Sequence, residues 1–244
     1  MPAEAVLEVE GLVKRYEGLL ALSGVDFSVS EGEIFGVIGP NGAGKTTLFS
    51  CLVGSVHANS GEVRFSGERI ERLPNYAIVA RGLVRTHQIV RPFRDMTVLE
   101  NVSIGAHFGR GRRRGEDARR RIGEILERTG LSRKADALAG TLTIGELKRL
   151  EIARSLATEP RVLCLDEVMG GLNPSEIVEA MKLIRSIRES GVTILMIEHH
   201  IHAVVGVSDR ILVLNFGQKI AEGKPSDVVR HPEVISAYLG QEAV

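Results

Sequence analysis

The glycine-rich stretch from Gly39 to Thr47 constrains this sequence more than any other feature. It reads Gly-Pro-Asn-Gly-Ala-Gly-Lys-Thr-Thr and fits the pattern G-x-x-x-x-G-K-[ST], which wraps a nucleotide phosphate. An apolar run, 34–38, leads in as a buried strand, and residues 46–49 lead out as a helix. A chance match in a glycine-rich turn is the alternative, and this strand and helix argue against it.

The residues of the stretch have separate predicted tasks. Gly42 and Gly44 let the backbone turn its N–H groups toward a phosphate, and the next helix points its positive dipole end at the same anion. Lys45 is expected to reach the β- and γ-phosphates, and the Thr46 hydroxyl to ligate Mg²⁺. The predicted nucleotide-binding residues here are Gly39, Asn41, Gly42, Ala43, Gly44, Lys45, Thr46 and Thr47.

Length and composition exclude several protein classes. The 244 residues suffice for one large domain or a domain with an inserted lobe. The 31 basic residues balance 31 acidic ones, so a generally basic nucleic-acid-binding protein is disfavoured. No apolar run or signal core predicts a membrane or secreted protein, which favours the cytosol. Cys51 and Cys164 lie in apolar surroundings and are predicted to be buried free thiols.

Apolar residues that alternate with polar ones, on both sides of the phosphate loop, predict antiparallel strands. Leu7 and Val9 alternate with acidic residues, and further strands are predicted at 25–29 and 61–67. Tyr16, in a polar setting, is a candidate platform for stacking on a purine base; the alternative is a partly exposed surface tyrosine.

The stretch 83–86 is predicted to run back into the core and to stop at Gln88. That glutamine is a candidate ligand of Mg²⁺ or of the attacking water, and a simple polar surface residue is the alternative. From about residue 89 the sequence becomes helical and charged, which predicts a helical lobe over about 89–155 inserted between 1–88 and 156–244.

An arginine-rich run opens the most charged part of this lobe. It is read either as a solvated loop and helix end or as a patch that attracts anionic lipid head groups or a nucleic acid. Its members are Arg110, Arg112, Arg113, Arg114, Arg119, Arg120 and Arg121. Further on, residues 142–146 open another helix, where the Thr143 hydroxyl and the Gly145 N–H predict a second anion-binding end.

Two adjacent acids follow the buried run 162–165. Because side chains alternate along a strand, we expect Asp166 and Glu167 to point to opposite sides, one toward Mg²⁺ and one toward a water. Such a pair supplies a metal-site acid and a general base; an acidic pair that merely ends the strand is the alternative.

A capped helix and a last buried strand complete the pattern. Asn173, Pro174 and Glu176 have the spacing of a helix start with a capping box. The strand 192–197 is followed by His199, which could contact a γ-phosphate; a helix start is the alternative. The chemistry therefore collects at carboxyl ends of strands, where open α/β sheets bind ligands.

Taken together, these residues resemble the nucleotide-binding subunits of ATP-binding-cassette transporters over essentially the whole chain. The motifs stand in the order of that family. They are the adenine-stacking aromatic at Tyr16, the Walker A loop at 39–47, the Q-loop at Gln88, the signature motif at 142–146, the Walker B strand at 162–167, the D-loop at 171–173 and the switch histidine at His199. Finer segments resemble one branch, the ATPases of branched-chain amino acid importers: 84–88, 93–101, 149–154, 171–174 and 232–240.

The resemblance implies a fold and a set of partners. The fold is an α/β P-loop NTPase of the ABC ATPase type, with a mainly parallel core sheet, an antiparallel β lobe and an inserted helical lobe. Its cofactors are ATP and Mg²⁺. The partners are a second ATPase subunit, identical or paralogous, transmembrane permease subunits and, indirectly, a substrate-binding protein. No nucleic acid is expected, and the location is peripheral on the inner face of the cell membrane.

The resemblance also implies a mechanism. Two subunits pack head to tail, and each ATP lies between the Walker A loop of one and the signature residues Thr143, Gly145 and Glu146 of the other. Glu167 polarises the attacking water and His199 holds the γ-phosphate. Asp166 and Gln88 bind the Mg²⁺ shell directly or through water, and a permease helix docks near Gln88 and the helical lobe.

Five positions depart from the family pattern. Thr143 stands for the usual Ser, Glu146 for a frequent Gln, His87 for an aromatic residue, Val168 for Pro and His200 for Asp. None removes a phosphate or metal contact, so hydrolysis is expected to survive.

Other functions within the superfamily are open to a chain of this kind. Related transport subunits serve urea or short amides and lipopolysaccharide export, and soluble relatives act in DNA repair, translation or iron–sulfur cluster assembly. Repair members carry long coiled coils or Cys clusters and translation members carry two cassettes, features that this sequence lacks. The branch-specific segments weigh against cluster assembly.

Overall fold

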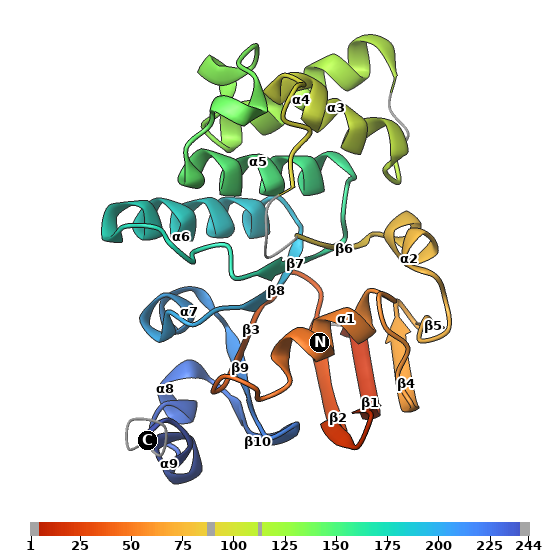
Figure 1. Cartoon of the computed structure of the whole chain (residues 1–244), viewed down its shortest axis with the longest axis vertical. Coiled ribbons are helices and arrows are strands. Elements are labelled where there is room, and N and C mark those ends of the chain that lie inside the picture. The colour runs from red at the N-terminus through yellow and green to blue at the C-terminus, as the bar shows by residue number, and fades with distance from the viewer. Residues whose placement is uncertain (1–4, 87–90, 112–113, 240–244) are drawn as a thin grey trace.

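The computed structural model describes residues 5–86, 91–111 and 114–239. Within them, the strands form two sheets, one of four strands in the order β2-β1-β4-β5 and one of six in the order β10-β9-β3-β8-β7-β6 (Figure 1). The smaller sheet contains β1 (Ala5–Tyr16), β2 (Leu19–Ser30), β4 (Ser60–Phe65) and β5 (Glu68–Arg69). The larger contains β3 (Ile34–Ile38), β6 (Leu83–Arg85), β7 (Val162–Asp166), β8 (Thr193–Ile197), β9 (Arg210–Asn215) and β10 (Gln218–Gly223).

The four-stranded sheet is antiparallel throughout, as the alternation predicted. Its first two strands are longer than the predicted 7–10 and 25–29, because β1 and β2 stay paired to Tyr16 and Leu19 through several register shifts. Many of the extra residues are partly or fully exposed, although Val6, Leu12 and Leu22 are buried, so the register shifts interrupt the apolar alternation that reveals a strand.

The six-stranded sheet is mainly parallel, which confirms the predicted fold class. Strands β6, β7, β8, β3 and β9 run parallel and β10 pairs antiparallel with β9. Every residue of β3, β7 and β8 is buried, as expected for strands covered on both faces.

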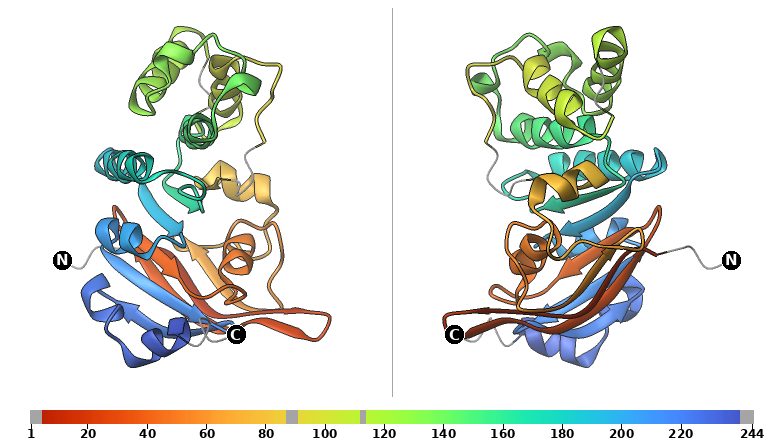
Figure 2. Two further views of the ribbon diagram at one scale, coloured as in Figure 1. Left: turned by 60° about the vertical axis from the view of Figure 1, so that its left-hand side comes forward. Right: turned by 90° about the vertical axis from the view of Figure 1, so that its right-hand side faces the viewer.

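Alternate residues of these strands belong to two separate hydrophobic clusters. Phe35, Val37 and Cys164 pack with the antiparallel sheet and α1 (Lys45–Leu52). Ile38 and Leu165 pack on the other side with α5 (Ile144–Ala157), α6 (Pro174–Glu189) and α7 (Ile201–Val207). Figure 2 shows the central sheet between these two layers. Both cysteines, Cys51 in α1 and Cys164 in β7, are buried free thiols, as predicted.

A group of helices lies at one end of the molecule (Figure 1). It consists of α3 (Val98–Phe108), α4 (Gly115–Arg128), α5 and two short 3-10 turns, η1 (Ser132–Lys134) and η2 (Ala139–Thr141). Ile122, Ile125 and Leu126 are the buried face of α4. This apolar face belongs to the same cluster that covers the parallel sheet.

The remaining helices are short and lie along the sheets. They are α2 (Asn75–Arg81), α8 (Pro225–Val228) and α9 (Pro232–Leu239). None of the helices in the described ranges combines the length and apolar character required to cross a bilayer.

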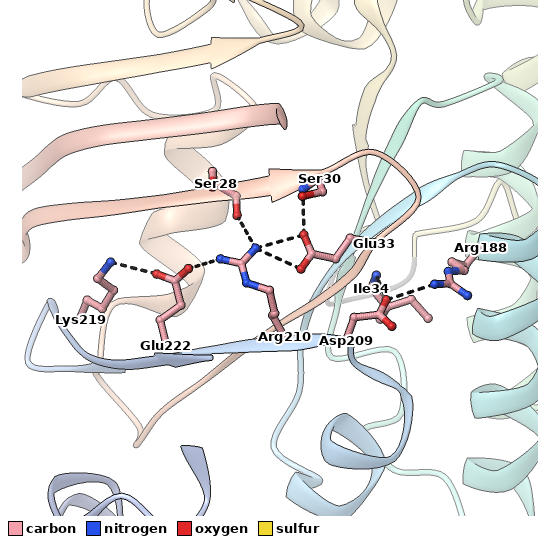
Figure 3. A network of polar contacts seen from close by, with 9 residues as sticks. All are labelled: Ser28, Ser30, Glu33, Ile34, Arg188, Asp209, Arg210, Lys219 and Glu222. Carbon is pink, nitrogen blue, oxygen red and sulfur yellow. Dashed lines mark hydrogen bonds and ion pairs between the residues drawn. The ribbon is translucent and has the colours of Figure 1, made fainter. Parts of the chain in front are cut away.

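A dense polar network closes the amino ends of β3 and β9 (Figure 3). Arg210 Nη1 donates to both carboxylate oxygens of Glu33, at 3.1 and 3.3 Å, and to the carbonyl oxygen of Ser28 at 3.2 Å. Arg210 Nη2 donates to Glu222, and the Ser30 N–H donates to Glu33 at 2.8 Å. The network ties both sheets together around one guanidinium group.

The same edge is joined to α6. Asp209 accepts a hydrogen bond from the Ile34 N–H at 2.9 Å and lies 3.5 Å from Arg188 (Figure 3). Arg188 Nε also donates to the Gly32 carbonyl oxygen at 2.8 Å, and the Gly32 N–H donates to the Thr193 hydroxyl at 2.9 Å. The amino ends of three strands and the carboxyl end of α6 are therefore fixed together.

Candidate functional site

The phosphate-loop candidate lies where predicted, between β3 and α1. Gly39, Gly42 and Gly44 have φ angles of 150°, 77° and 101°, which favour glycine. A Cβ at Gly44 would stand 2.5 Å from the Ala21 carbonyl oxygen, so a side chain is also excluded by space. No side chain caps the start of α1, which leaves its first N–H groups available to an anion.

Lys45 is the charged group of this loop and is almost fully buried. Its Nζ donates to the carbonyl oxygens of Gly39 at 2.6 Å and Pro40 at 2.8 Å. Burial lowers the pKa of Lys45, and the nearby Glu167 carboxylate acts in the opposite direction. A buried ammonium group at a glycine-rich loop that precedes a helix suits an anionic ligand.

Asp166 and Glu167 separate as expected, but the predicted reason was wrong. Asp166 is the last residue of β7, whereas Glu167 follows the strand with φ 50°, in the left-handed region. A turn, and not the alternation of a strand, therefore separates the two carboxylates. The Glu167 N–H donates to the Ile197 carbonyl oxygen at 2.9 Å, and Lys148 Nζ donates to the Glu167 carbonyl oxygen at 2.8 Å.

The Glu167 carboxylate faces the next strand end. Its Oε1 lies 2.7 Å from His199 Nε2, and His199 is about half exposed. The helix-start reading of the adjacent histidines is confirmed, because His200 precedes α7 as its N-cap residue. The phosphate contact of His199 stays a prediction. The carboxyl ends of β3, β7 and β8 thus bring Lys45, Asp166, Glu167 and His199 to one edge of the sheet.

Asp166 has two unlike carboxylate oxygens. Its Oδ2 accepts from Arg85 Nε at 3.2 Å and Arg85 Nη2 at 2.5 Å, while Oδ1 is buried without a hydrogen-bond partner. An unsatisfied buried oxygen is unfavourable unless a ligand or an ion meets it. This oxygen fits the predicted Mg²⁺ shell.

The described residues contain no cluster of three or more His, Cys, Asp or Glu side chains that could hold a metal. Mg²⁺ commonly needs only one or two protein ligands, because substrate phosphates supply the others. The predicted pair of Asp166 and Thr46 has that number of ligands. Gln88, the third predicted ligand, lies outside the described residues.

A further acid, Glu198, lies next to His199 and is buried. Its Oε1 accepts from the Met169 N–H at 2.8 Å. Burial raises the pKa of Glu198 to about 7, with the nearby Glu167 acting in the same direction. The residue therefore links the end of β8 to the segment that follows Glu167.

The predicted second anion-binding end, at the start of α5, carries a capping box within the chain. Thr143 Oγ1 accepts from the Glu146 N–H at 3.3 Å, and Glu146 Oε2 accepts from the Thr143 N–H at 2.9 Å. This backbone hydrogen bond lowers the pKa of Glu146, and Lys134 acts in the same direction. The Glu146 carboxylate thus caps α5, and Gly145 is buried beside Glu176.

Tyr16 and the start of α5 belong to different parts of the molecule from the phosphate loop. Tyr16 ends β1 with 41% of its surface exposed, and Lys14 Nζ lies 4.8 Å from its ring centroid. The start of α5 belongs to the helical group, whereas α1 lies against the antiparallel sheet (Figure 1).

Sequence reasoning missed three residues at the site: Arg85, Lys148 and Glu198. For Arg85 and Lys148, nothing in the local sequence shows which acid or carbonyl group they reach. Glu198 gave a usable signal, because an acid directly after a fully apolar strand is expected to be partly buried.

Two family models match this sequence. The model described as ABC transporter matches residues 22–170, and the model described as branched-chain amino acid ATP-binding cassette transporter matches 218–244. The chain belongs to the ATP-binding-cassette transporter family. This membership confirms the resemblance inferred from the motifs.

Curated relatives of this ABC subunit match over almost its entire length. The high-affinity branched-chain amino acid transport ATP-binding protein BraF of Pseudomonas aeruginosa is 43% identical, covering 97% of this chain and 98% of the relative. The corresponding LivG protein of Escherichia coli K12 is 42% identical, covering 98% and 99%. The lipopolysaccharide export system protein LptB of Escherichia coli K12 is 32% identical, covering 98% of both chains.

Solved structures agree with the fold of this ABC subunit. The ADP conformation of the ATP-binding cassette MJ1267 has a TM-score of 0.89 and 32% identity, covering 98% of this chain and all of that one. A dimeric ABC transporter cassette, MJ0796, has a TM-score of 0.80 and 26% identity, covering 90% and 98%.

Proposed function

We propose that this chain is the ATP-hydrolysing subunit of an importer for branched-chain and similar hydrophobic amino acids. The observation that carries the proposal is the Glu167–His199 pair, 2.7 Å apart, at the strand ends beside the phosphate loop. The cargo is inferred from the BraF and LivG names and from the match at residues 218–244.

The proposed chemistry assigns one task to each side chain. The loop 39–47 holds the phosphates of ATP, and Lys45 adds positive charge at the β- and γ-phosphates. Glu167 accepts a proton from the attacking water, and His199 orients Glu167 and contacts the γ-phosphate. Magnesium supplies charge neutralisation when bound, and Asp166, Thr46 and Gln88 are the residues that would hold it.

The proposed working unit is a head-to-tail pair of subunits. Thr143, Gly145 and Glu146 lie on the helical group, apart from α1, so we assign them to the ATP site of the second subunit. Tyr16 is assigned to the adenine base. The dimeric form of MJ0796 supports such a pair. Within it, we propose that about 89–155 acts as one lobe that carries closure to a permease at the inner face of the membrane.

Lipopolysaccharide export is the second candidate, because LptB covers the chain as completely as LivG does. Its identity is 32% against 42%, which favours amino-acid import. Uptake of labelled leucine by cells lacking the gene separates the two. Restored uptake with the parent gene, and none with Glu167→Gln, is expected; normal uptake in the deletion strain would remove the import proposal.

The shared-site proposal has its own test in purified protein. Because each ATP needs two subunits, Mg²⁺-dependent hydrolysis per subunit should rise with protein concentration in a dilution series. If the natural partner is a paralogue, mixing the two should restore the rate. Strict proportionality to concentration, with a monomer shown by light scattering, would contradict the shared site.

A further inference from the structure

Arg85, the last residue of β6, is held on three sides. Its Nε and Nη2 donate to Asp166 Oδ2 at 3.2 and 2.5 Å, and its Nη1 donates to the Ser50 hydroxyl of α1 at 3.0 Å. The guanidinium carbon lies 5.8 Å from the ring centroid of Phe49. Only 15% of the arginine side chain is exposed, and none of Asp166.

The pairing uses only half of the carboxylate. An arginine fork commonly meets both oxygens of a carboxylate, one nitrogen to each. Here two nitrogens meet Oδ2, while Oδ1 is buried and has no hydrogen-bond partner. The arrangement neutralises the charge of Asp166 and still leaves one oxygen with unused acceptor capacity.

The neighbouring residue fixes the backbone of the same aspartate. The Asp166 N–H donates to Thr86 Oγ1 at 3.0 Å, and the Thr86 N–H donates to the Cys164 carbonyl oxygen at 2.9 Å. Arg85 therefore binds the side chain of Asp166, and Thr86 binds its backbone N–H. Both residues come just before Gln88 in the sequence.

We propose that Arg85 is a positioning residue that presents Asp166 Oδ1 to a divalent cation and whose charge limits how tightly that cation binds. The inference rests on the proposed function, because the cation is the magnesium that accompanies ATP. A guanidinium and a divalent ion that share one buried carboxylate repel each other, and the low effective dielectric strengthens this repulsion. Arg85 therefore raises the magnesium concentration at which the site fills.

Removing Arg85 should change two quantities in opposite directions: the stability of the ligand-free protein should fall, and the affinity for the cation should rise. Without the ion, the lone Asp166 charge is buried and unpaired, so the ligand-free protein loses stability. With the ion, the repulsion is gone, so the cation binds more tightly. A structural role alone predicts the first effect and leaves cation affinity unchanged.

Arg81 offers a matched control. Its Nε and Nη2 also meet one carboxylate, that of Glu68, each at 2.8 Å. This pair is on the surface and involves none of the proposed site residues. Arg81→Gln therefore removes an arginine–carboxylate pair near β6 without touching the cation site.

The experiment uses Mn²⁺ as the probe, in the full chain carrying Glu167→Gln, so that bound ATP is not consumed. Free Mn²⁺ is measured by electron paramagnetic resonance in a titration at saturating ATP, and ligand-free thermal unfolding is measured in parallel. Arg85→Gln should bind Mn²⁺ about tenfold more tightly than its parent while unfolding at a lower temperature. Arg85→Lys, which keeps the charge on a single donor, should bind about two- to threefold more tightly, and Arg81→Gln should match the parent.

Unchanged or weaker Mn²⁺ binding by Arg85→Gln would overturn the inference, even with reduced stability. If Arg85→Gln does not fold, the Mn²⁺ affinity of Arg85→Lys is the test. An affinity equal to or weaker than that of the parent would then overturn the inference. If the parent itself binds no Mn²⁺ with ATP, the proposed function fails instead, so the two failures are distinguishable.

Discussion

At the amino ends of β3 and β9, Arg210 lies between two carboxylates, those of Glu33 and Glu222. At the carboxyl end of β7, Arg85 meets one carboxylate, that of Asp166. Both Glu33 oxygens accept hydrogen bonds, and Ser30 adds another. Asp166 keeps one oxygen without a partner. Two arginine–carboxylate contacts in one sheet thus differ in how fully the carboxylate is satisfied.

The difference separates a structural contact from a binding contact. A saturated network gains nothing from a ligand and has its whole effect on stability. A carboxylate that is neutralised but not saturated can accept an ion without first losing a bond. The amino edge should therefore respond to mutation through stability, and the carboxyl edge through binding and rate.

The largest expected effect is on the carboxyl edge. Glu167→Gln keeps the size of the side chain but removes its basicity, and losing a general base costs about 10² to 10⁴ in rate. ATP should still bind, so this variant should run as an ATP-bound dimer on a sizing column. Phosphate release measures the rate, and hydrolysis within a few-fold of the parent would refute the assignment.

Lys45→Ala is the matched contrast on the same edge. Lys45 adds charge at the phosphates before and during the reaction, so its loss should weaken ATP binding itself. Equilibrium binding of ATP should fall, and no ATP-bound dimer should form on the sizing column. A variant that binds ATP as the parent does would remove Lys45 from the phosphate site.

The amino edge should show the reverse behaviour. Arg210→Met leaves Glu33 buried without its charge partner, so the free energy of unfolding should fall by roughly 3 to 4 kcal/mol in a urea titration. Hydrolysis per folded molecule should change little. Lys182→Met, which breaks the exposed pair of Lys182 with Glu179, is the control and should cost less than about 1 kcal/mol. A large loss of activity without a loss of stability would break the comparison.

Glu198 gives a pH test at the carboxyl edge. Its pKa is raised from 4.5 in the unfolded chain to about 7 in the folded one, so folding favours its protonated form. Its contribution to stability is complete below about pH 4.5 and is lost as pH rises through about 7, on the order of 3 kcal/mol in total. Unfolding titrations of the parent and Glu198→Gln at pH 5 and pH 8 should therefore diverge, with the variant relatively more stable at pH 8. If the free energies of unfolding of the parent and the variant differ by the same amount at both pH values, the raised pKa of Glu198 is ruled out.

The smallest effect is expected from the arginine-rich run. Arg120 pairs with Asp117 at 2.8 Å on an exposed helix face, and such pairs contribute about 0 to 1 kcal/mol. Replacing Arg114, Arg119 and Arg120 by Gln should leave hydrolysis intact and at most weaken flotation with anionic vesicles. A large loss of hydrolysis in solution would place this run in the mechanism.

The local sequence predicted those elements whose structure depends mainly on interactions between neighbouring residues. The runs 34–38 and 162–165 are buried strands because unbroken apolar residues need cover on both faces, and Asn173 caps α6 through its own side chain, as predicted. The strand-end location of Glu167 and His199 followed from the rule for open α/β sheets.

Contacts between distant segments were not predictable in this way. Arg85 and Asp166 are 81 residues apart and meet only because β6 pairs with β7. The sequence analysis assigned the Thr143 hydroxyl to an anion and did not show that Thr143 and Glu146 form a capping box. The backbone of Glu167, in the left-handed region, is hydrogen-bonded to Ile197 and Lys148, which lie in other elements.

The two buried cysteines have a practical consequence. Burial raises the pKa of Cys51 to about 11 and that of Cys164 to about 12, so neither thiolate is available near neutral pH. Maleimide reagents should therefore leave the natural chain unlabelled. A cysteine introduced at Ile144, which is 63% exposed at the start of α5, would carry a fluorophore at a single position with both native thiols kept. Its emission would record, in real time, when another subunit covers that end of the helix.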